Sequence, residues 1–438
     1  MSKLIVLPLF LFFCFSDSAS QKESESAYLD YAASWKVGNA SLGEFLKTSE
    51  LIGNSSGINA HAKHLRKLEE RAAKVIADKI GAAPNQIHFT SGSTVANNIA
   101  ILGVAYKNPK CRLITSKIEH KSVLNVFKHL ETLGYKVTYL DVDQYGNIDL
   151  NQLRECIRND TKLISIQMFN SEIGTLQNME AIGRIAKERG VLFHTDAAQS
   201  FCKYDIDVER TNIDLLTMSG HKIGSPKGIG ALYVRDTEKL QPIIFGSGDV
   251  LFPGTKPTPL ICAFAGAVKS FKIDRAKIKA NFGSFVAELL KIEKIHINSS
   301  TPSHIVSVSI DGVLLKDLQE RMEKYSFSAG CSCLGQDKSN VISAIDPENK
   351  LPSCTIRISF SDQMKEEQLI NFARKLKSVV EQLRQEKKIG KGCQSMTDDS
   401  KKDLSNSLNK IQDLIKKGKK YEQEGMHRAI INIHRNCE

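Results

Sequence analysis

Short apolar and β-branched runs alternate with longer amphipathic segments between residues 86 and 234. The short runs predict strands, at residues 86–90, 112–115, 136–142, 162–169, 191–195, 215–219 and 231–234. Segments between them, such as 122–133 and 178–189, repeat apolar residues with the period of an α-helix. This alternation predicts an α/β fold with a mostly parallel sheet covered by helices on both faces, whose ligands bind at the carboxyl ends of the strands.

The pattern changes after Pro253, Gly254 and Thr255. Helical and strand-like segments then follow in an order that predicts a smaller α+β domain, at residues 261–273, 305–310, 314–325, 354–360 and on to about Arg384. We therefore expect four parts, namely a signal-like segment (1–20), an N-terminal arm with a large domain (27–256), a small domain (257–385) and a Lys-rich linker with an amphipathic tail (386–438).

The first residues resemble a targeting signal. Lys3 precedes an apolar run over residues 4–15, and small polar residues up to Ser20 follow it. This order is typical of a signal peptide cleaved after Ser20, and the run is too short for a transmembrane span. It predicts export or delivery to an organelle by the secretory route. A short anchor, which would touch a membrane only if uncleaved, and a misassigned start with a mitochondrial or cytoplasmic location remain as alternatives.

Composition adds two constraints. The chain has ten cysteines, and those outside the signal-like segment are scattered without framework spacing. This favours reduced thiols over a disulfide scaffold, which stands against export. The net charge is +11, partly from the basic tail. A basic tail favours acidic partners, but no zinc spacing or aromatic-basic interleaving accompanies it, so we expect no nucleic-acid binding.

A lysine and an aspartate each follow a predicted strand directly. Lys222, in Ser-Gly-His-Lys, suits an amine that is partly desolvated and deprotonated to form an imine; the alternative is a surface turn. Asp196 ends a buried strand and needs a positive partner. A protonated pyridine nitrogen would supply one, although a salt bridge or a helix cap would also explain this aspartate.

Two further motifs lie at strand ends. The run Thr-Ser-Gly-Ser-Thr over residues 90–94 precedes a predicted helix, whose free amides and hydroxyls can hold a phosphate dianion. A plain helix cap is the alternative. His120 follows the strand at 112–115, where its ring could stack on a cofactor and relay protons, although a single histidine is more often structural.

The small domain carries two thiols and an arginine. Cys331 and Cys333 lie in a Gly-flanked segment that could present a thiolate to a substrate. A metal fragment is the alternative, but no second Cys or His pair is suitably spaced nearby, so we expect no metal. Arg357 lies in an apolar run, where a substrate carboxylate would be a bidentate partner. Together these motifs indicate a pyridoxal 5'-phosphate (PLP) enzyme.

On these motifs the chain resembles the NifS/IscS cysteine desulfurases of the class V aminotransferase group, from Tyr28 to about Arg384. The most specific stretches are residues 89–92, 116–123, 172–174, 196–199, 219–222 and 228–234. The resemblance implies the PLP-dependent transferase fold, similar to that of aspartate aminotransferase, and a homodimer.

The resemblance also implies roles for single residues. Lys222 would carry PLP, Asp196 would contact the ring nitrogen and His120 would stack on the ring. The other cofactor contacts that it implies are Ser93, Thr94, Ser171, Gln199 (to the phenolic oxygen), Ser219, His221 and Thr255 of the partner subunit. Cys333 would be the persulfide-forming nucleophile, and Asn54 and Arg357 would bind the substrate.

The implied reaction removes sulfur from L-cysteine. Alanine leaves, and the persulfide on Cys333 passes to a sulfur-acceptor or scaffold protein for iron–sulfur cluster assembly or thio-modification. Another enzyme of the class V group, such as a selenocysteine lyase or an aminotransferase, and a non-catalytic PLP-binding paralogue are the alternatives.

Four positions depart from the family pattern. Ser171 replaces an asparagine before Glu-Ile-Gly, Ser55 replaces a proline, and the early Thr-Thr-Pro reads Ser-Trp-Lys over residues 34–36. The Gly-rich run before Thr255 is shorter and lacks its arginine. These departures affect substrate and dimer contacts more than the PLP core, and the Lys-rich tail lies outside the resemblance.

Overall fold

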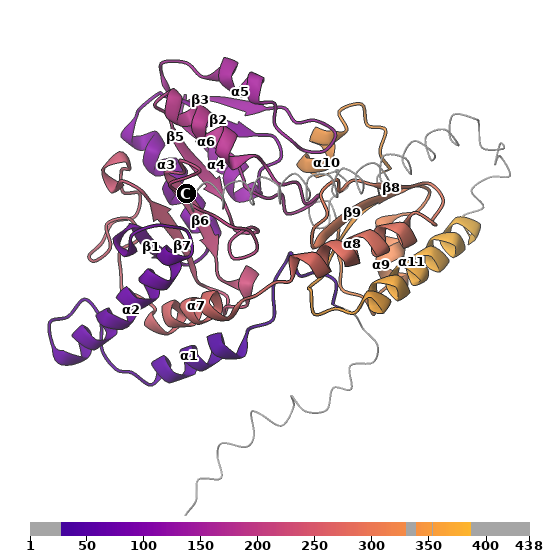
Figure 1. The fold of residues 1–438 in the computed structure, drawn as a ribbon. Coiled ribbons are helices and arrows are strands. Elements are labelled where there is room, and N and C mark those ends of the chain that lie inside the picture. The colour runs from indigo at the N-terminus through magenta and orange to yellow at the C-terminus, as the bar shows by residue number, and fades with distance from the viewer. Residues whose placement is uncertain (1–27, 330–338, 353, 387–438) are drawn as a thin grey trace, which may run out of the picture. The chain divides into compact units, whose positions relative to one another are not determined.

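A seven-stranded mixed sheet lies at the centre of the larger region of the molecule (Figure 1). The computed structural model describes residues 28–329, 339–352 and 354–386. The sheet has the order β1-β7-β6-β5-β4-β2-β3 and comprises β1 (Ile87–Thr90), β2 (Arg112–Ser116), β3 (Lys136–Leu140), β4 (Thr161–Ser165), β5 (Leu192–Asp196), β6 (Leu215–Ser219) and β7 (Gly230–Val234). The strands from β6 to β3 are parallel, and β7 is antiparallel to both of its neighbours. The predicted strands and the mostly parallel sheet are therefore confirmed, although β3 and β4 end earlier than expected.

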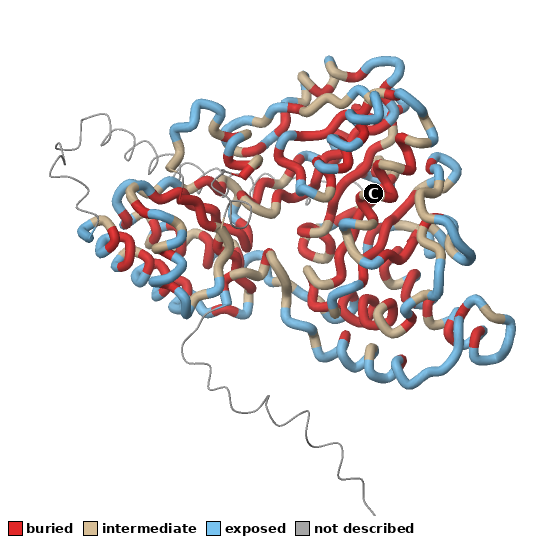
Figure 2. The backbone as a smooth tube through the Cα atoms, turned by 180° about the vertical axis from the view of Figure 1, so that it is seen from behind, coloured by how far each residue is buried: buried red, intermediate tan, exposed pale blue. Residues whose placement is uncertain are grey.

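Helices cover both faces of this sheet. Adjacent residues of each strand point to opposite faces, and apolar side chains on both faces pack against helices. Leu113 packs in one core cluster with Phe127, whereas its neighbour Ile114 packs in another with Ile182. Figure 2 shows the buried positions of these strands in red. The covering helices include α3 (Ser93–Lys107), α4 (Lys121–Thr132), α5 (Leu150–Cys156) and α6 (Met179–Glu188).

Three helices lie beside this core, namely α1 (Asn39–Ser49), α2 (Ala60–Asp78) and α7 (Thr258–Ser270). The helix α7 packs against both α1 and α2. Its Ile261 and Phe264 belong to the same apolar cluster as Ile114 of the large sheet. α7 thus packs with elements of the large sheet, while the sequence pattern assigned its residues to the small domain. The division of the chain itself stays a prediction.

A second, antiparallel sheet has the order β10-β11-β9-β8. Its strands are β8 (Ile295–Ile297), β9 (Ile305–Ile310), β10 (Ser328–Ala329) and β11 (Cys354–Ser359), and the helices of this region are α8 (Arg275–Leu289), α9 (Leu315–Arg321), α10 (Asn340–Ile345) and α11 (Glu366–Glu386). The short elements β8, β10 and α10 were not expected from the sequence. The N-terminal arm adds parallel bridges from Tyr28 to Ser326 and from Asp30 to Ser359.

Contacts divide the chain into two compact units at Val379/Val380, inside α11. Of the second unit, only residues 380–386 are described, and they continue that helix. The signal-like segment, Cys331, Cys333 and the Lys-rich tail lie outside the described residues. Within the described part, no helix is both long enough and apolar enough to cross a membrane.

Candidate active site

Lys222 lies in a short 3-10 helix, His221–Ile223, directly after β6. Its Nζ donates hydrogen bonds to the carbonyl oxygens of Ala32 at 2.5 Å and Ala33 at 2.9 Å. Burial, and next the charge of Arg357, lowers the pKa of this amine from 10.5 to about 8. About a tenth of Lys222 is therefore uncharged at pH 7, far more than of an ordinary lysine, and an amine that forms an imine must be uncharged.

Asp196 ends β5 and is 8% exposed. One carboxylate oxygen accepts a hydrogen bond from Asn97 Nδ2 at 2.8 Å, and the other accepts one from the backbone N–H of Ala198 at 2.9 Å. Among the described residues Asp196 forms no ion pair, so the salt-bridge alternative is not supported. A buried carboxylate held by neutral donors can still accept a cationic N–H.

His120 caps the N-terminus of α4. Its Nδ1 accepts a hydrogen bond from the backbone N–H of Ser122 at 3.1 Å and lies 2.8 Å from Ser122 Oγ. Asn97 Nδ2 also donates to Ser122 Oγ at 2.8 Å, so one amide connects His120 with Asp196. Desolvation lowers the pKa of His120 despite the opposing charge of Asp196. The imidazole is therefore neutral near pH 7, and Nε2 is the ring nitrogen left for other partners.

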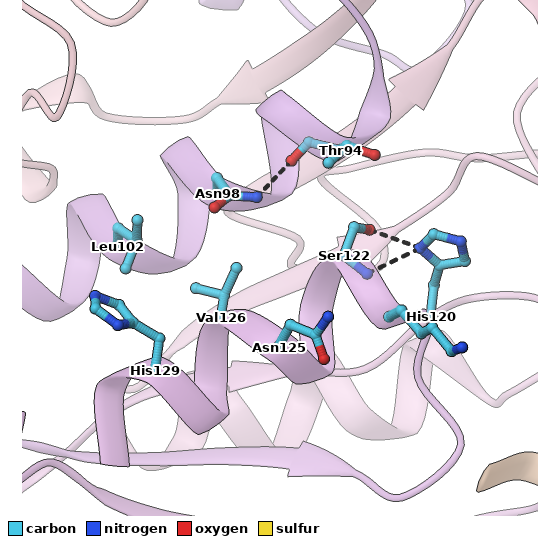
Figure 3. A pocket seen from close by; sticks show the side chains of 9 residues that line it. Thr94, Asn98, Leu102, His120, Ser122, Asn125, Val126 and His129 are labelled. Carbon is cyan, nitrogen blue, oxygen red and sulfur yellow. Dashed lines mark hydrogen bonds between the residues drawn. The ribbon is translucent and has the colours of Figure 1, made fainter. Parts of the chain in front are cut away.

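A cavity of about 410 Å³ opens between α3 and α4 beside His120. Figure 3 shows Thr94 and Asn98 of α3 on one side and His120 and Ser122 at the start of α4 on the other. Leu102 and His129 lie toward the opposite end. The cavity thus extends outward from the predicted phosphate loop along both helices.

The predicted phosphate loop leads from β1 into α3, which begins at Ser93. Gly92 caps this helix with a φ of +151°, which favours glycine. The first amides of the helix have no partner within it and can bind an anion. Gly230 of β7 packs so near this loop that a Cβ on it would lie 2.8 Å from the Gly92 Cα. β6 thus ends beside the loop, because Gly230 pairs with Ser219.

The hydroxyl of Ser219 is buried and has no hydrogen-bond partner among the residues that the structure describes. Such an orphaned group is rare in folded proteins and fits an absent polar ligand. Next to it, His221 lies with Nδ1 3.4 Å from Ser34 Oγ, and burial lowers the pKa of His221 to about 4. A neutral imidazole and a free hydroxyl are both able to donate to a phosphate oxygen. These residues therefore fit the phosphate of PLP.

Gln199 is buried and shares a hydrogen-bond partner with Lys222. Its Nε2 donates to Ala32 O at 2.7 Å, and its Oε1 accepts from Lys203 Nζ at 3.2 Å. Because Lys222 donates to the same carbonyl oxygen of Ala32, the structure brings Gln199 and Lys222 together.

Arg357 points from β11 toward the N-terminal arm. Its Nη2 donates to Asp30 Oδ1 at 2.7 Å and to Ser328 Oγ at 2.8 Å, and its Nη1 donates to the carbonyl oxygen of Ser171 at 3.0 Å. Within the described part of the chain, its buried Nε has no hydrogen-bond partner. One donor of the guanidinium therefore stays open to a substrate carboxylate.

The replacement of the family's asparagine by Ser171 is not compensated by the adjacent Asn170. Asn170 Nδ2 donates to Ile118 O at 3.0 Å, and its Oδ1 accepts from the backbone N–H groups of Glu172 and Ile173. This side chain shapes its own turn. Ser171 contributes its carbonyl oxygen to Arg357.

Asn54 and Thr255 are exposed and contact each other, with Asn54 Nδ2 3.3 Å from Thr255 Oγ1. The structure does not join this pair to Lys222, so the roles of Asn54 toward the substrate and of Thr255 toward a second subunit stay predictions. Cys333, the predicted nucleophile, lies outside the described residues. The strand that precedes its segment, β10, pairs Ser328 with Arg357.

Sequence reasoning missed Asn97, Lys203 and Asp30. Asn97 and Lys203 lie within three or four residues of predicted site positions, and Asn97 also has the one-turn offset from Ser93 that would place both on one helix face. Asp30 had no comparable signal, because its partner Arg357 is 327 positions away.

Comparisons with known proteins identify the family of this chain. The class-V aminotransferase family matches residues 27–372. Cysteine desulfurase IscS of Neisseria gonorrhoeae is 38% identical over 377 residues, or 82% of this chain and 93% of that protein. The mitochondrial cysteine desulfurase of Candida albicans is 38% identical over 361 residues, or 78% of this chain and 74% of that protein.

Solved structures give the same result. SspA in complex with cysteine is 38% identical, with a TM-score of 0.69 over 76% of this chain and 99% of that one. A NifS-like protein is 28% identical, with a TM-score of 0.74 over 81% of this chain and 99% of that one. The chain therefore belongs to the class-V aminotransferase family, and within it to the cysteine desulfurases.

Proposed function

We propose that this chain removes sulfur from L-cysteine with PLP held on Lys222. The observation that carries the proposal is that Lys222, with a pKa of about 8, follows β6 at the same edge of the sheet where Asp196 ends β5. Asp196 is a buried carboxylate that has no cationic partner among the described residues. These are the two groups that PLP requires from a protein, an amine for imine formation and an anion for its ring nitrogen. When bound, PLP would supply an electron sink for the substrate α-carbon.

The residues around these two complete the proposed cofactor site. Asp196, held by Asn97, would keep the ring nitrogen protonated. The amides at Ser93 and Thr94 and the unpartnered hydroxyl of Ser219 would hold the phosphate dianion. The Nε2–H of Gln199 would donate to the phenolic oxygen. We also propose that Thr255 of the partner subunit completes the phosphate site, which makes the enzyme a homodimer.

The proposed substrate site is built around Arg357 and His120. Arg357 would bind the substrate carboxylate through its open Nε–H, while Asp30 and Ser171 hold the guanidinium in place. His120 would take or return a proton at Nε2, because its Nδ1 is engaged by Ser122. SspA, a solved relative, is described in complex with cysteine, which supports L-cysteine as the substrate here.

Cys333 is the proposed sulfur acceptor within the enzyme. Its thiolate would attack the substrate sulfur, the C–S bond would break with its electron pair going to carbon, and alanine would leave after protonation of that carbon. The sulfur would remain as a persulfide on Cys333 until a sulfur-acceptor or scaffold protein takes it. The pairing of Ser328 with Arg357 supports this role. It places β10, the strand that precedes the Cys333 segment, beside Arg357, the proposed partner of the substrate carboxylate.

The location remains a proposal as well. The signal-like residues 1–20 favour the secretory route. A mitochondrial protein among the relatives, from Candida albicans, keeps the mitochondrial alternative open to test.

Borohydride reduction of the purified yellow protein, followed by peptide mapping, tests the proposal. We expect the pyridoxyl group on Lys222, and we expect sulfide and alanine in equal amounts from L-cysteine in the presence of a reductant. Label on another lysine, or a colourless protein that PLP cannot reconstitute, would contradict the cofactor assignment. Alanine without sulfide would contradict the reaction.

A further inference from the structure

A second lysine is buried close to the proposed cofactor site and has no role in the proposed reaction. Lys203 is 3% exposed, and burial, with the nearby charge of Lys222, lowers the pKa of its amine well below the ordinary value. Among the described residues it contacts Gln199 and Trp35 and pairs with no carboxylate. Because buried lysines are costly unless they are paired, this placement calls for a function.

The backbone before Lys203 is also unusual. Cys202 has a left-handed φ of +62°, a conformation that residues other than glycine rarely adopt. This turn follows Gln199 and directs the next side chain into the interior, where the Lys203 Nζ lies 5.6 Å from the centre of the Trp35 ring. Backbone strain of this kind persists where the surrounding structure requires one particular geometry.

We propose that Lys203 is a positioning residue that holds the Gln199 amide with its N–H edge toward the phenolic oxygen of PLP. Lys203 Nζ donates to Gln199 Oε1 at 3.2 Å, and Gln199 Nε2 donates to Ala32 O at 2.7 Å. A flipped amide would place its NH₂ group against the Lys203 amine and its oxygen against the oxygen of Ala32. Both ends therefore select one orientation.

The orientation of the Gln199 amide decides whether an N–H group or an oxygen atom faces the phenolic oxygen of PLP. A donor beside that oxygen stabilises its anionic form, whereas an amide oxygen would repel it. Polarisation of the amide by Lys203 also makes Nε2–H a stronger donor. This inference rests on the proposed role of Gln199 toward PLP and adds the group that enforces it.

Four variants of the full chain test the inference. Lys203→Met removes the donor at similar length, and Lys203→Gln keeps an N–H donor. Gln199→Ala and the double variant Lys203→Met/Gln199→Ala show whether Lys203 acts through Gln199. Lys79→Met is the matched control, since Lys79 is an exposed lysine near the same turn. The fluorescence of Trp35, the only tryptophan, reports the local environment and its quenching by added PLP.

We expect Lys203→Met to weaken PLP binding about tenfold, as loss of one buried hydrogen bond does. We also expect it to raise the pH midpoint of the visible absorbance band of the PLP-loaded protein by about one unit. In the Gln199→Ala background the same change should alter affinity by less than about twofold. Lys203→Gln should recover part of the loss, and Lys79→Met should behave as wild type.

Two results would overturn the inference. One is a Lys203→Met protein with wild-type affinity and pH midpoint. The other is an equal effect in the Gln199→Ala background, which would mean that Lys203 acts directly. If Lys203→Met does not fold, Lys203→Leu, which also lacks a donor, would overturn the inference equally if its pH midpoint and affinity were those of the wild type. A wild-type chain that binds no PLP would instead refute the proposed function, and this inference with it.

Discussion

The cofactor side and the substrate side of the proposed site are built differently. Lys222, Asp196 and Ser219 lie at the ends of adjacent buried strands, where backbone pairing sets their positions. On the substrate side, Arg357 is held by side-chain and carbonyl contacts from three separate segments, and Asn54 lies in an exposed loop. The departures from the family pattern, at residues 34–36, 55 and 171 and in the run before Thr255, lie in loops outside the strands of the sheet. Strand ends tolerate little change, whereas loops accept substitutions and deletions.

This contrast predicts its largest effect at Lys222. Lys222→Ala should lower sulfide release by about 10³-fold or more, because it removes both the attachment of PLP and an amine able to move a proton at the substrate α-carbon. Sulfide release and the visible spectrum measure the two losses. Lys227→Ala, a nearby lysine on the surface, serves as the control. Activity retained in the Lys222 variant would reject the strand-end site.

The next effect separates chemistry from cofactor binding. Cys333→Ser should abolish sulfide release and leave the visible spectrum of the PLP-loaded protein intact, since the proposed ring contacts lie on other segments. Cys331→Ser should retain most activity, because a nucleophile two residues away is displaced by several ångströms along the chain. Sulfide release at the wild-type rate from Cys333→Ser would favour a lyase or an aminotransferase.

Arg357→Ala should act on substrate binding. Loss of a charge-assisted contact to the substrate carboxylate should raise KM for L-cysteine about 10- to 100-fold, with a smaller change in PLP affinity. Steady-state kinetics and PLP titration separate the two. Arg374 is an exposed side chain of α11 that pairs with Glu288 of α8, and Arg374→Ala should leave both quantities unchanged. Equal losses in both quantities would mean that the two sides of the site are not independent.

The pH dependence of PLP capture by Lys222 tests whether Arg357, on the substrate side, influences the cofactor side. Only the uncharged amine of Lys222 attacks PLP, so the capture rate should rise as pH increases through about 8 and level off above that pH. The change is about tenfold per pH unit below the midpoint. Arg357→Ala should move the midpoint upward, because the guanidinium charge helps to lower the pKa of Lys222. Stopped-flow absorbance would record the midpoint, and one near 10.5 would contradict the burial argument.

The smallest effect is expected at the N-terminus. Removing residues 1–20 should change the free energy of unfolding by less than about 0.5 kcal/mol, because these residues precede the arm that contacts β11. Denaturant unfolding measures this. In the native cell, mass spectrometry should find an N-terminus near Gln21, and an uncleaved Met1 would count against the signal peptide.

Local order along the chain was enough to predict part of the site. Strand periodicity located the ends of β2, β5 and β6, and His120, Asp196 and Lys222 could be predicted because each follows one of those ends within a few residues. The mostly parallel sheet followed from the same alternation. The short elements β8 and β10 were missed, because two or three residues carry too little periodicity to be detected.

Which distant groups meet depended on the tertiary fold. The ion pair of Asp30 with Arg357 and the two bonds of Lys222 to the arm join residues that are 189 to 327 positions apart. The amide of Asn97 bridges Asp196 and Ser122, and Lys203 turns inward to Gln199. The composition of the chain does not predict either contact. Protonation depended on the fold as well. Burial moves the pKa of Lys222 to about 8 and that of His221 to about 4, because desolvation depends on what the folded chain packs around each group.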